Sequence, residues 1–303
     1  MASRSDATTW PRLSETRIAS LQRAMTLALE SRTDVATIVV VPCYNEASRL
    51  DLTAFDAFIA CCADVSLLFV DDGSTDDTPL LIERLRQRRP RRVLTLRLGT
   101  NVGKAEAVRR GMQLAIRRRA AMAGYWDADL ATPLDAISRF QSVLEERPEV
   151  LLVMGSRVAL LGRQIRRRWR RHLLGRAFAT AASFVLGLPV YDTQCGAKLF
   201  RVTPQTMELF RQPFGTRWIF DVEILARIVK ASSVMSQCAA AEVLYEYPLE
   251  RWHEVYGSRL KSMDFFVAAF DLAGIYWRSR GGEAAMPPNV EHPVSGIQHR
   301  DAA

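Results

Sequence analysis

Five short apolar runs alternate with helical patterns between residues 37 and 154, and this rhythm constrains the fold more than any other feature of the chain. Helices are expected between the runs, over 48–62, 76–88, 103–121 and 133–146. Continuous apolar strands separated by helices are typical of a parallel sheet that is covered on both faces. We therefore predict a doubly wound α/β fold. The runs read TIVVV (37–41), SLLFV (66–70), VLTLR (93–97), GYWD (124–127) and VLLVM (150–154).

The segments that follow these runs are rich in acids, glycine and short polar side chains. In a doubly wound fold, ligands bind beyond the carboxyl ends of the strands. The convergence of such segments at one edge therefore predicts a binding site there. The segments read PCYNEA (42–47), DDGSTDDT (71–78), GTNVGKAEA (99–107), DADLATP (127–133) and GSR (155–157).

Two acids in the fourth segment, Asp127 and Asp129, stand one residue apart. Carboxylates this close repel each other unless a cation lies between them, so the pair indicates a divalent metal site. A surface turn that leads into a helix is the alternative interpretation.

Asp71 follows an apolar run and is expected to accept hydrogen bonds from a base or ribose. Ser74 or Thr75 is expected to cap the following helix. Gly103 and Lys104 are expected to begin another helix, whose N-terminus favours phosphate. The chain contains neither GxxxxGK[ST] nor GxGxxG, which argues against a P-loop enzyme and against a dinucleotide dehydrogenase.

The net charge of +8 comes largely from arginine clusters at 85–92, 116–119 and 163–176. Such clusters suit phosphate-bearing partners, anionic lipid or simply solvent. Nucleic acid is disfavoured, because only Trp169 is interleaved with the arginines and no nucleic-acid-binding signature occurs. The five cysteines lack disulfide or zinc spacing, and we find neither a signal peptide nor a membrane-spanning run. We expect a cytoplasmic protein that associates peripherally with the membrane.

Three regions are expected along the chain. Residues 1–34 form an N-terminal arm, partly helical or disordered, 35–280 form the folded domain, and 281–303 form a disordered tail. The domain divides into a donor half (35–160) and an acceptor half (161–280). A basic stretch followed by an apolar one over 163–188 favours an interfacial membrane helix, with a buried core helix as the alternative. The segment at 262–277 is expected to be amphipathic rather than spanning.

Several motifs in fixed order resemble a known enzyme family. VPCYNEA, FVDDGSTDDT, NVGKAEAVRRGM and DADLATP resemble the nucleotide-sugar-binding half of family 2 glycosyltransferases, inverting enzymes with a GT-A fold. DTQCGAKLFR (192–201), RWIFDVEIL (217–225) and RWHEVYGSRLK (251–261) are similar to the polyprenyl-phosphate sugar transferases, most of all to those that transfer β-glucose to dolichyl phosphate. The resemblance implies a Rossmann-like, mixed, mostly parallel sheet flanked by helices, with an interfacial helical acceptor region.

The resemblance also implies a donor site for a nucleoside diphosphate sugar, UDP-glucose in the first place. Asp127 and Asp129 would hold Mg²⁺ or Mn²⁺ on the diphosphate, and Asp129 is counted as catalytic. Ala131 stands where related mannosyl-transferring enzymes keep a glutamine, which favours glucose. The base and ribose would be bound by Pro42, Tyr44, Glu46 and Asp71, with Lys104 near by.

The implied acceptor is a polyprenyl phosphate, either dolichyl or undecaprenyl, at an anionic membrane surface. Its phosphate oxygen is already anionic, so cations that position it matter more than a strong base. Arg157 and Asp221 are expected to be catalytic; Asp221 would orient the sugar or an arginine, or else cap a helix over 222–232. Surface exposure to solvent is the alternative for each expected cation. The acceptor phosphate would meet Arg157, Lys198, Arg201 and Arg259.

Two alternatives remain open for the reaction itself. A family 2 enzyme of this kind could act on a soluble or saccharide acceptor, with the basic run as its anion-binding surface. GDP-mannose could replace UDP-glucose as the donor. A nucleic-acid-binding module is the alternative from another functional class.

Overall fold

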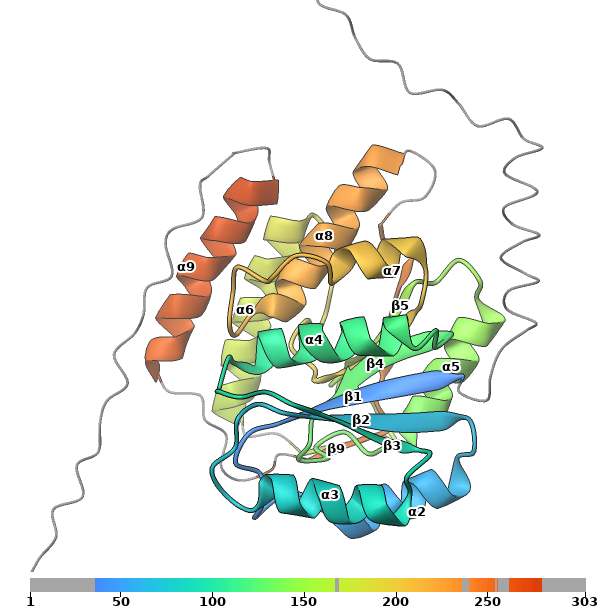
Figure 1. Ribbon diagram of the computed structural model, residues 1–303. Coiled ribbons are helices and arrows are strands. Elements are labelled where there is room, and N and C mark those ends of the chain that lie inside the picture. The colour runs from blue at the N-terminus through green and yellow to red at the C-terminus, as the bar shows by residue number, and fades with distance from the viewer. Residues whose placement is uncertain (1–35, 167–168, 236–239, 254, 256–261, 280–303) are drawn as a thin grey trace, which may run out of the picture.

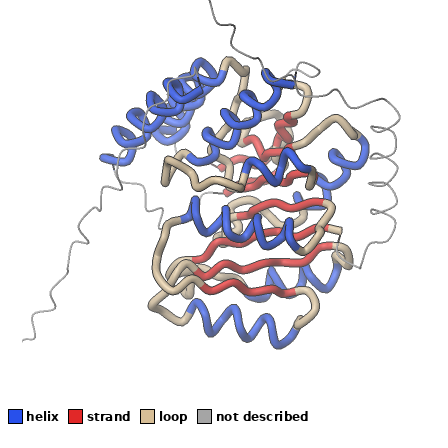
Figure 2. Tube along the Cα trace, turned by 45° about the horizontal axis from the view of Figure 1, so that its top comes forward, coloured by secondary structure: helices blue, strands red, loops and turns tan. Residues whose placement is uncertain are grey.

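The computed structural model describes residues 36–166, 169–235, 240–253, 255 and 262–279. Seven strands form one sheet in the order β3-β2-β1-β4-β7-β5-β8 (Figures 1 and 2), and every pairing is parallel except those of β7. The predicted mixed, mostly parallel sheet is confirmed. Its strands are β1 (Thr37–Cys43), β2 (Val65–Asp71), β3 (Val93–Arg97), β4 (Met122–Trp126), β5 (Leu152–Ser156), β7 (Ala197–Arg201) and β8 (Leu244–Pro248).

The five apolar runs all form strands of this sheet, and their burial explains why they contain no polar face. All seven residues of β2 are buried, as are all five of β4 and of β5. The edge strand β3 alternates in burial, because it has a sheet neighbour on one side only. A pattern of continuous apolar residues therefore marks the central strands.

Helices cover both faces of the sheet. One face packs against apolar residues of α2, α3 and α5, and the other packs against those of α4, α6, α8 and α9. The four helices predicted in the first half are present, with starts three to four residues later than expected for α2 and α5. The helices are α2 (Leu52–Cys61), α3 (Thr78–Arg88), α4 (Lys104–Arg117), α5 (Ala136–Glu146), α6 (Trp169–Leu186), α7 (Pro204–Leu209), α8 (Phe220–Met235) and α9 (Ser262–Ser279).

Strand direction decides which loops meet. Cys43 at the end of β1 pairs with Asp71 at the end of β2, so the loops that follow these strands share one edge of the sheet. The antiparallel strand β7 runs the other way, so Ala197 at its start pairs with Trp126 at the end of β4. The segment that precedes β7 therefore joins the same edge, which we call the carboxyl edge.

The second half of the chain adds a helical layer and a small second sheet. Helices α6, α8 and α9 pack against one another beside the main sheet (Figure 1), and β6 (Gln164–Arg166) pairs in parallel with β9 (Arg251–His253). Among the described helices, we find none with the length and apolar character of a membrane span. The predicted arm at 1–34 and tail at 281–303 lie outside the described residues.

Candidate functional site

The loops that follow β1 and β2 are tied together into one unit. The backbone N–H groups of Asn45, Glu46 and Ala47 donate to side chains of Ser74, Thr78 and Asp76, and Thr75 N–H donates to Asn45 Oδ1 at 2.8 Å. The prediction that Ser74 or Thr75 caps the helix is wrong, because α3 begins at Thr78 after Asp77. Ser74 and Thr75 lie in the loop after β2 instead, and their contacts with Asn45 hold that loop against the loop after β1.

Asp71 lies in the floor of this unit and is only 4% exposed. Its Oδ1 accepts from the Ser74 N–H at 3.0 Å. Its Oδ2 is buried and accepts no hydrogen bond from the described residues, although Arg97 Nε lies 3.4 Å away. A buried carboxylate oxygen without a donor is costly, so this atom is suited to accept a hydrogen bond from a ligand.

Asp72, the next residue, has a structural role that the sequence did not reveal. Its two carboxylate oxygens accept from the N–H groups of Val102 and Gly103 at 2.8 and 2.9 Å. Gly103 has φ +96°, a conformation that favours glycine. Asp72 therefore holds the loop that leads into α4 and fixes where Lys104, the first residue of that helix, stands.

The Asp127 and Asp129 carboxylates lie in a tight turn directly after β4. The Leu130 N–H donates to the Asp127 carbonyl oxygen, the Ala131 N–H donates to Asp129 Oδ1 at 3.1 Å, and Leu130 has φ +53°. Asp127 Oδ1 also receives a hydrogen bond from Lys104 Nζ at 2.5 Å. The turn thus faces both carboxylates toward the carboxyl edge beside the start of α4.

Gly196 shapes the other side of this turn. The Asp127 N–H donates to the Gly196 carbonyl oxygen at 3.0 Å, and a Cβ at position 196 would stand 1.9 Å from Asp127 Oδ2. Only a residue without a side chain leaves room for the carboxylate here. The segment before β7 therefore supports the acidic turn at close range.

The electrostatics of the turn fit a divalent cation. Burial raises the pKa of Asp129, and the negative charge of Asp127 raises it further, against the opposing effects of the Ala131 N–H, Lys104 and Arg49. Burial opposes the charge of Lys104, but Asp127, Asp221 and Asp129 together raise its pKa. Two carboxylates leave most of a Mg²⁺ or Mn²⁺ coordination shell to phosphate oxygens and water. The oxygen-only donor set therefore suits a metal that is bound together with a diphosphate.

Lys198 does not face the acceptor phosphate as predicted. Its side chain is 0% exposed, and Nζ donates to the carbonyl oxygens of Thr193 and Cys195 and to Asp221 Oδ1 at 2.6 Å. These three partners use all three donors of the ammonium group. Lys198 therefore holds the segment before β7 against the sheet from below, and its assignment to phosphate binding is wrong.

Asp221 belongs to the same buried cluster. It lies in the first turn of α8 rather than at a cap, and its Oδ1 also accepts from the Tyr125 hydroxyl at 2.5 Å. Burial and the Asp221 carboxylate raise the pKa of Tyr125 well above its ordinary value, which keeps the hydroxyl a donor. The alternative interpretation of Asp221 as an N-cap is wrong.

Arg157, directly after β5, is held by a carboxylate that the sequence analysis did not single out. Asp192 accepts from its Nε at 2.6 Å and its Nη2 at 2.7 Å, and Trp252 lies under the guanidinium with 5.3 Å between Cζ and the ring centroid. Burial lowers the pKa of Arg157, but Asp192 prevails and raises it overall. Glu246 in turn holds the Tyr191 and Asp192 N–H groups at 2.8 Å. Arg157 is therefore a fixed cation near the carboxyl edge.

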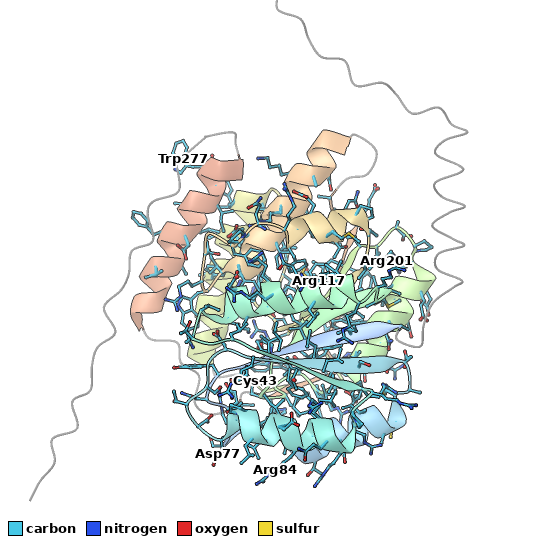
Figure 3. The ribbon with its side chains drawn as sticks, viewed as in Figure 1. Cys43, Asp77, Arg84, Arg117, Arg201 and Trp277 are labelled. Carbon is cyan, nitrogen blue, oxygen red and sulfur yellow. The ribbon has the colours of Figure 1, made fainter. Side chains whose placement is uncertain are left out.

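Arg201 does not belong to the site. It ends the antiparallel strand β7 and pairs with Met122 at the start of β4. Its guanidinium donates to the carbonyl oxygens of Leu144, Arg147 and Val150. Figure 3 shows Arg201 at the end of the sheet opposite to Cys43, and the prediction that it meets the acceptor phosphate is wrong. Arg259 lies outside the described residues.

The family model described as Glycosyl transferase family 2 matches residues 38–204, more than half of the chain. The chain belongs to glycosyl transferase family 2. The turn with Asp127 and Asp129, the unit around Asp71 and the buried Lys198 all lie within the matched residues of this glycosyltransferase.

Two curated relatives resemble this glycosyltransferase over most of its length. It is 31% identical to the dolichyl-phosphate beta-glucosyltransferase of Dictyostelium discoideum over 252 residues, which cover 78% of this chain and 71% of the relative. It is 30% identical to the polyprenol monophosphomannose synthase of Mycolicibacterium smegmatis over 245 residues, which cover 81% of this chain and 90% of the relative.

The fold is that of solved glycosyltransferases. Glucosyl-3-phosphoglycerate synthase from Mycobacterium tuberculosis superposes with a TM-score of 0.56 at 18% identity, over 89% of this chain and 86% of that one. That structure is described as a complex with Mn²⁺, uridine diphosphate and glucosyl-3-phosphoglycerate. At this identity the likeness establishes the GT-A fold alone.

Most of the predicted donor residues come together in this glycosyltransferase. The carboxyl edge gathers Asp71, Lys104, Asp127 and Asp129, and the loop with Tyr44 and Glu46 follows β1 there. The Glu46 carboxylate also receives Arg49 Nη2 at 2.5 Å, a contact that no sequence pattern indicated. Asp72, Asp192 and Glu246 were missed because each acts on a backbone that lies far away in the sequence.

Proposed function

We propose that this glycosyltransferase transfers a hexose, glucose in the first place, from UDP-glucose to a polyprenyl phosphate at an anionic membrane surface. The observation that carries the donor half is the acidic turn beside Lys104 at the same edge as the unsatisfied Asp71 oxygen. The acceptor half rests on the similarity to two enzymes named for dolichyl phosphate and polyprenol substrates.

The donor would bind with its base and ribose against Pro42, Tyr44, Glu46 and Asp71. Asp127 and Asp129 would hold Mg²⁺ or Mn²⁺, which when bound neutralises charge on the departing nucleoside diphosphate. Lys104 keeps its charge beside Asp127 and would face the same phosphates. We assign these roles because the residues lie at the same carboxyl edge of the sheet.

The acceptor would need little help from a base. A phosphate monoester oxygen is already anionic near neutral pH, so orientation and charge complementarity carry the step. The engagement of Asp221 by Lys198 and Tyr125 supports this proposal, because it leaves Asp221 as a positioning residue. Arg157, held rigid by Asp192, would then orient the acceptor phosphate.

Exposed apolar side chains on α9 support a membrane surface for the acceptor. Val267, Phe270 and Trp277 repeat at helical spacing on one face, and Phe270 and Trp277 are 86% and 66% exposed. Figure 3 shows Trp277 at one end of α9, pointing away from the sheet. On α6, Phe184 is 81% exposed, whereas the charge of Arg176 turns toward the Tyr191 ring at 3.8 Å from its centroid. The basic residues 167–168 lie outside the described residues.

The proposed reaction is tested by supplying radiolabelled UDP-glucose with Mn²⁺ and polyprenyl phosphate, and then extracting the lipid. The expected result is organic-soluble label that mild acid releases as glucose. GDP-mannose as the more active donor would correct the sugar. Transfer to phosphoglycerate or a saccharide, with no label in the lipid, would contradict the lipid acceptor and favour the soluble one.

Replacing Asp71 with Ala is expected to raise the KM for the donor about tenfold or more, with a smaller effect on kcat. The lost contact is a hydrogen bond to a charged acceptor, which is worth about 1.5–3 kcal/mol. Steady-state kinetics over a donor series measure both constants. The control is Asp77→Ala, because the Asp77 side chain makes no cap hydrogen bond at the start of α3. An unchanged donor KM in Asp71→Ala would remove Asp71 from the donor site.

Replacing Phe270 and Trp277 together with Ser is expected to weaken binding to anionic vesicles at least about 100-fold. Burial of a large apolar side chain contributes roughly 1.5–3 kcal/mol, and two are removed. Co-sedimentation with phosphatidylglycerol vesicles gives the partition coefficients. Leu80→Ser is the control, since Leu80 is 51% exposed on α3, which covers the other face of the sheet. Equal sedimentation of all three proteins would mean that α9 does not touch the bilayer.

A further inference from the structure

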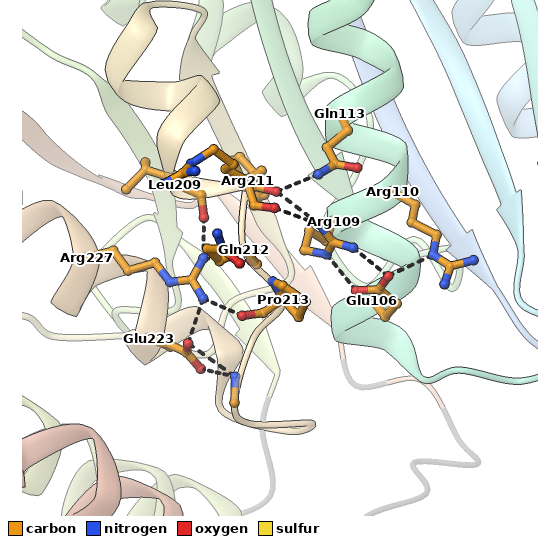
Figure 4. A network of polar contacts seen from close by, with 12 residues as sticks. Glu106, Arg109, Arg110, Gln113, Leu209, Arg211, Gln212, Pro213, Glu223 and Arg227 are labelled. Atoms are coloured by element: carbon orange, nitrogen blue, oxygen red, sulfur yellow. Dashed lines mark hydrogen bonds and ion pairs between the residues drawn. The ribbon is translucent and has the colours of Figure 1, made fainter. Parts of the chain in front are cut away.

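The segment between α7 and α8 lies along α4, and polar side chains from two helices hold it there. On α4, Arg109 donates to the carbonyl oxygens of Phe210 and Arg211, and Gln113 Nε2 donates to Phe210 O at 2.8 Å. Arg109 is itself fixed by Glu106, whose Oε2 lies 2.6 Å from Arg109 Nε (Figure 4). The segment is therefore fastened to the helix that begins at Lys104.

Helix α8 fastens the same segment from its other side. Arg227 donates to the carbonyl oxygens of Leu209, Gln212 and Pro213 and pairs with Glu223 at 2.8 Å (Figure 4). Glu223 accepts from the Gly215 N–H and the Thr216 hydroxyl. Such a satisfied network of partly buried charges makes a rigid support. Its effect is to fix the backbone immediately before Arg217.

Arg217 extends from this support over the start of α4. A Cβ built on Gly103 would lie 3.4 Å from both Nε and Nη2 of Arg217, so the guanidinium rests against the Gly103 backbone. The charge of Arg217 also lowers the pKa of Asp72, although burial, the larger effect, leaves that pKa raised. Arg217 is exposed, and within the part of the chain that the structure describes it makes no hydrogen bond or ion pair.

Arg217 differs in this respect from the other cations around the donor site. Lys104 is bound to Asp127, Arg157 to Asp192, Arg97 faces Asp71, and Arg49 is bound to Glu46. Each of those charges is balanced by a carboxylate within 4.0 Å. Arg217 is a cation whose donors have no partner in the described part of the chain, and a rigid support places it beside Lys104.

We propose that Arg217 is a donor-binding residue that contacts the diphosphate of the nucleotide sugar and that α4 and α8 hold in position for it. The inference rests on the proposed function. A guanidinium offers paired N–H donors that match two phosphate oxygens, so it complements the metal on the diphosphate from the side of α4. A Cβ at position 103 would already be in van der Waals contact with the guanidinium, so glycine leaves it the most room.

A structural role for Arg217 as a counterion of Asp72 is the competing explanation. It predicts a different result, because loosening the 102–103 loop would disturb the whole donor site. A contact with the diphosphate affects only ligands that carry phosphates. Nucleoside and nucleoside diphosphate therefore separate the two roles.

The test compares Arg217→Gln with the wild type by isothermal titration with UDP, UDP-glucose and uridine in the presence of Mn²⁺. We expect UDP and UDP-glucose to bind about 10- to 100-fold more weakly, in keeping with a lost charge-assisted bidentate contact, and uridine to change by less than about twofold. Arg217→Lys should recover part of the loss, since it keeps the charge without the fork. The control is Arg211→Gln, an exposed arginine on the same segment that is paired with Glu208.

Each other outcome is informative. Unchanged UDP binding by Arg217→Gln would overturn the inference, and so would an equal loss for UDP and uridine, which would indicate the counterion role. A loss for UDP-glucose alone would assign Arg217 to the sugar and would also overturn it. If the wild type binds neither UDP nor, in a parallel titration, GDP, then the proposed function fails, and the inference fails with it.

Discussion

Asp127→Asn is expected to lower the rate of sugar transfer by about three orders of magnitude while the protein stays folded. The substitution preserves volume but removes one charge from the pair that would hold the metal. A metal that stabilises the leaving group contributes several kcal/mol, and each 1.36 kcal/mol is a factor of ten in rate. Asp129→Asn should have a similar effect. Initial rates over a Mn²⁺ series, together with circular dichroism, measure the two halves of this prediction.

The control for Asp127→Asn is Asp135→Asn in the same loop. Asp135 pairs with Arg251 at an exposed position and makes no side-chain cap bond to α5, so its substitution should change the rate by less than about twofold. A second control addresses Lys104, because Asp127→Asn also removes the charge of the carboxylate that Lys104 Nζ contacts. A high Mn²⁺ concentration should restore some activity if the metal is the cause. Wild-type rates with unchanged metal dependence in Asp127→Asn would contradict the metal assignment.

Lys198→Met is expected to reduce the free energy of unfolding by about 3–5 kcal/mol, the cost of breaking a buried ion pair on one side. Asp221 would then keep its charge in the core with the Tyr125 hydroxyl as its remaining partner among those given above. The carbonyl oxygens of Thr193 and Cys195 would lose their donor as well. Denaturant unfolding followed by fluorescence gives the difference.

The matched control for Lys198→Met is Lys104→Met. Both lysines pair with an aspartate, but the Lys104 side chain is 39% exposed, so its substitution should cost no more than about 1 kcal/mol. The double variant Lys198→Met with Asp221→Asn should recover part of the lost stability, because the buried charge is gone. Equal destabilisation by the two lysine substitutions would mean that Lys198 is not a buried structural cation.

The apolar runs and the loops between them were enough to predict the first half of the fold. Buried parallel strands must be apolar on both faces, so their pattern is visible in TIVVV or SLLFV without any structure. The position of the short segments at the carboxyl edge then indicates which residues are candidates for ligand binding. Asp71, Asp127 and Asp129 were predicted in this way, and the structure brings them to one edge of the sheet.

Strand direction was beyond the reach of the sequence and decided the outcome for the acceptor residues. Lys198 and Arg201 both lie in AKLFR, a run whose residues do not reveal in which direction the strand lies in the sheet. Because β7 is antiparallel, Arg201 reaches the edge opposite to the site, and Lys198 is buried beneath the segment that precedes the strand. The resemblance implied a mixed sheet without specifying where the antiparallel strand lies.

The sequence by itself determined which residues could carry charge, bind a cation or enter a core, since these properties belong to a side chain and its immediate neighbours. Only the tertiary structure decided which of these charged groups are engaged in hydrogen bonds or ion pairs. Asp72 is engaged by the loop at 102–103, Arg157 is held by Asp192, and Arg217, beside Gly103, has no hydrogen-bond or ion-pair partner among the described residues. Each of these contacts joins residues about 30 or more positions apart, where separation along the chain says nothing about distance in space.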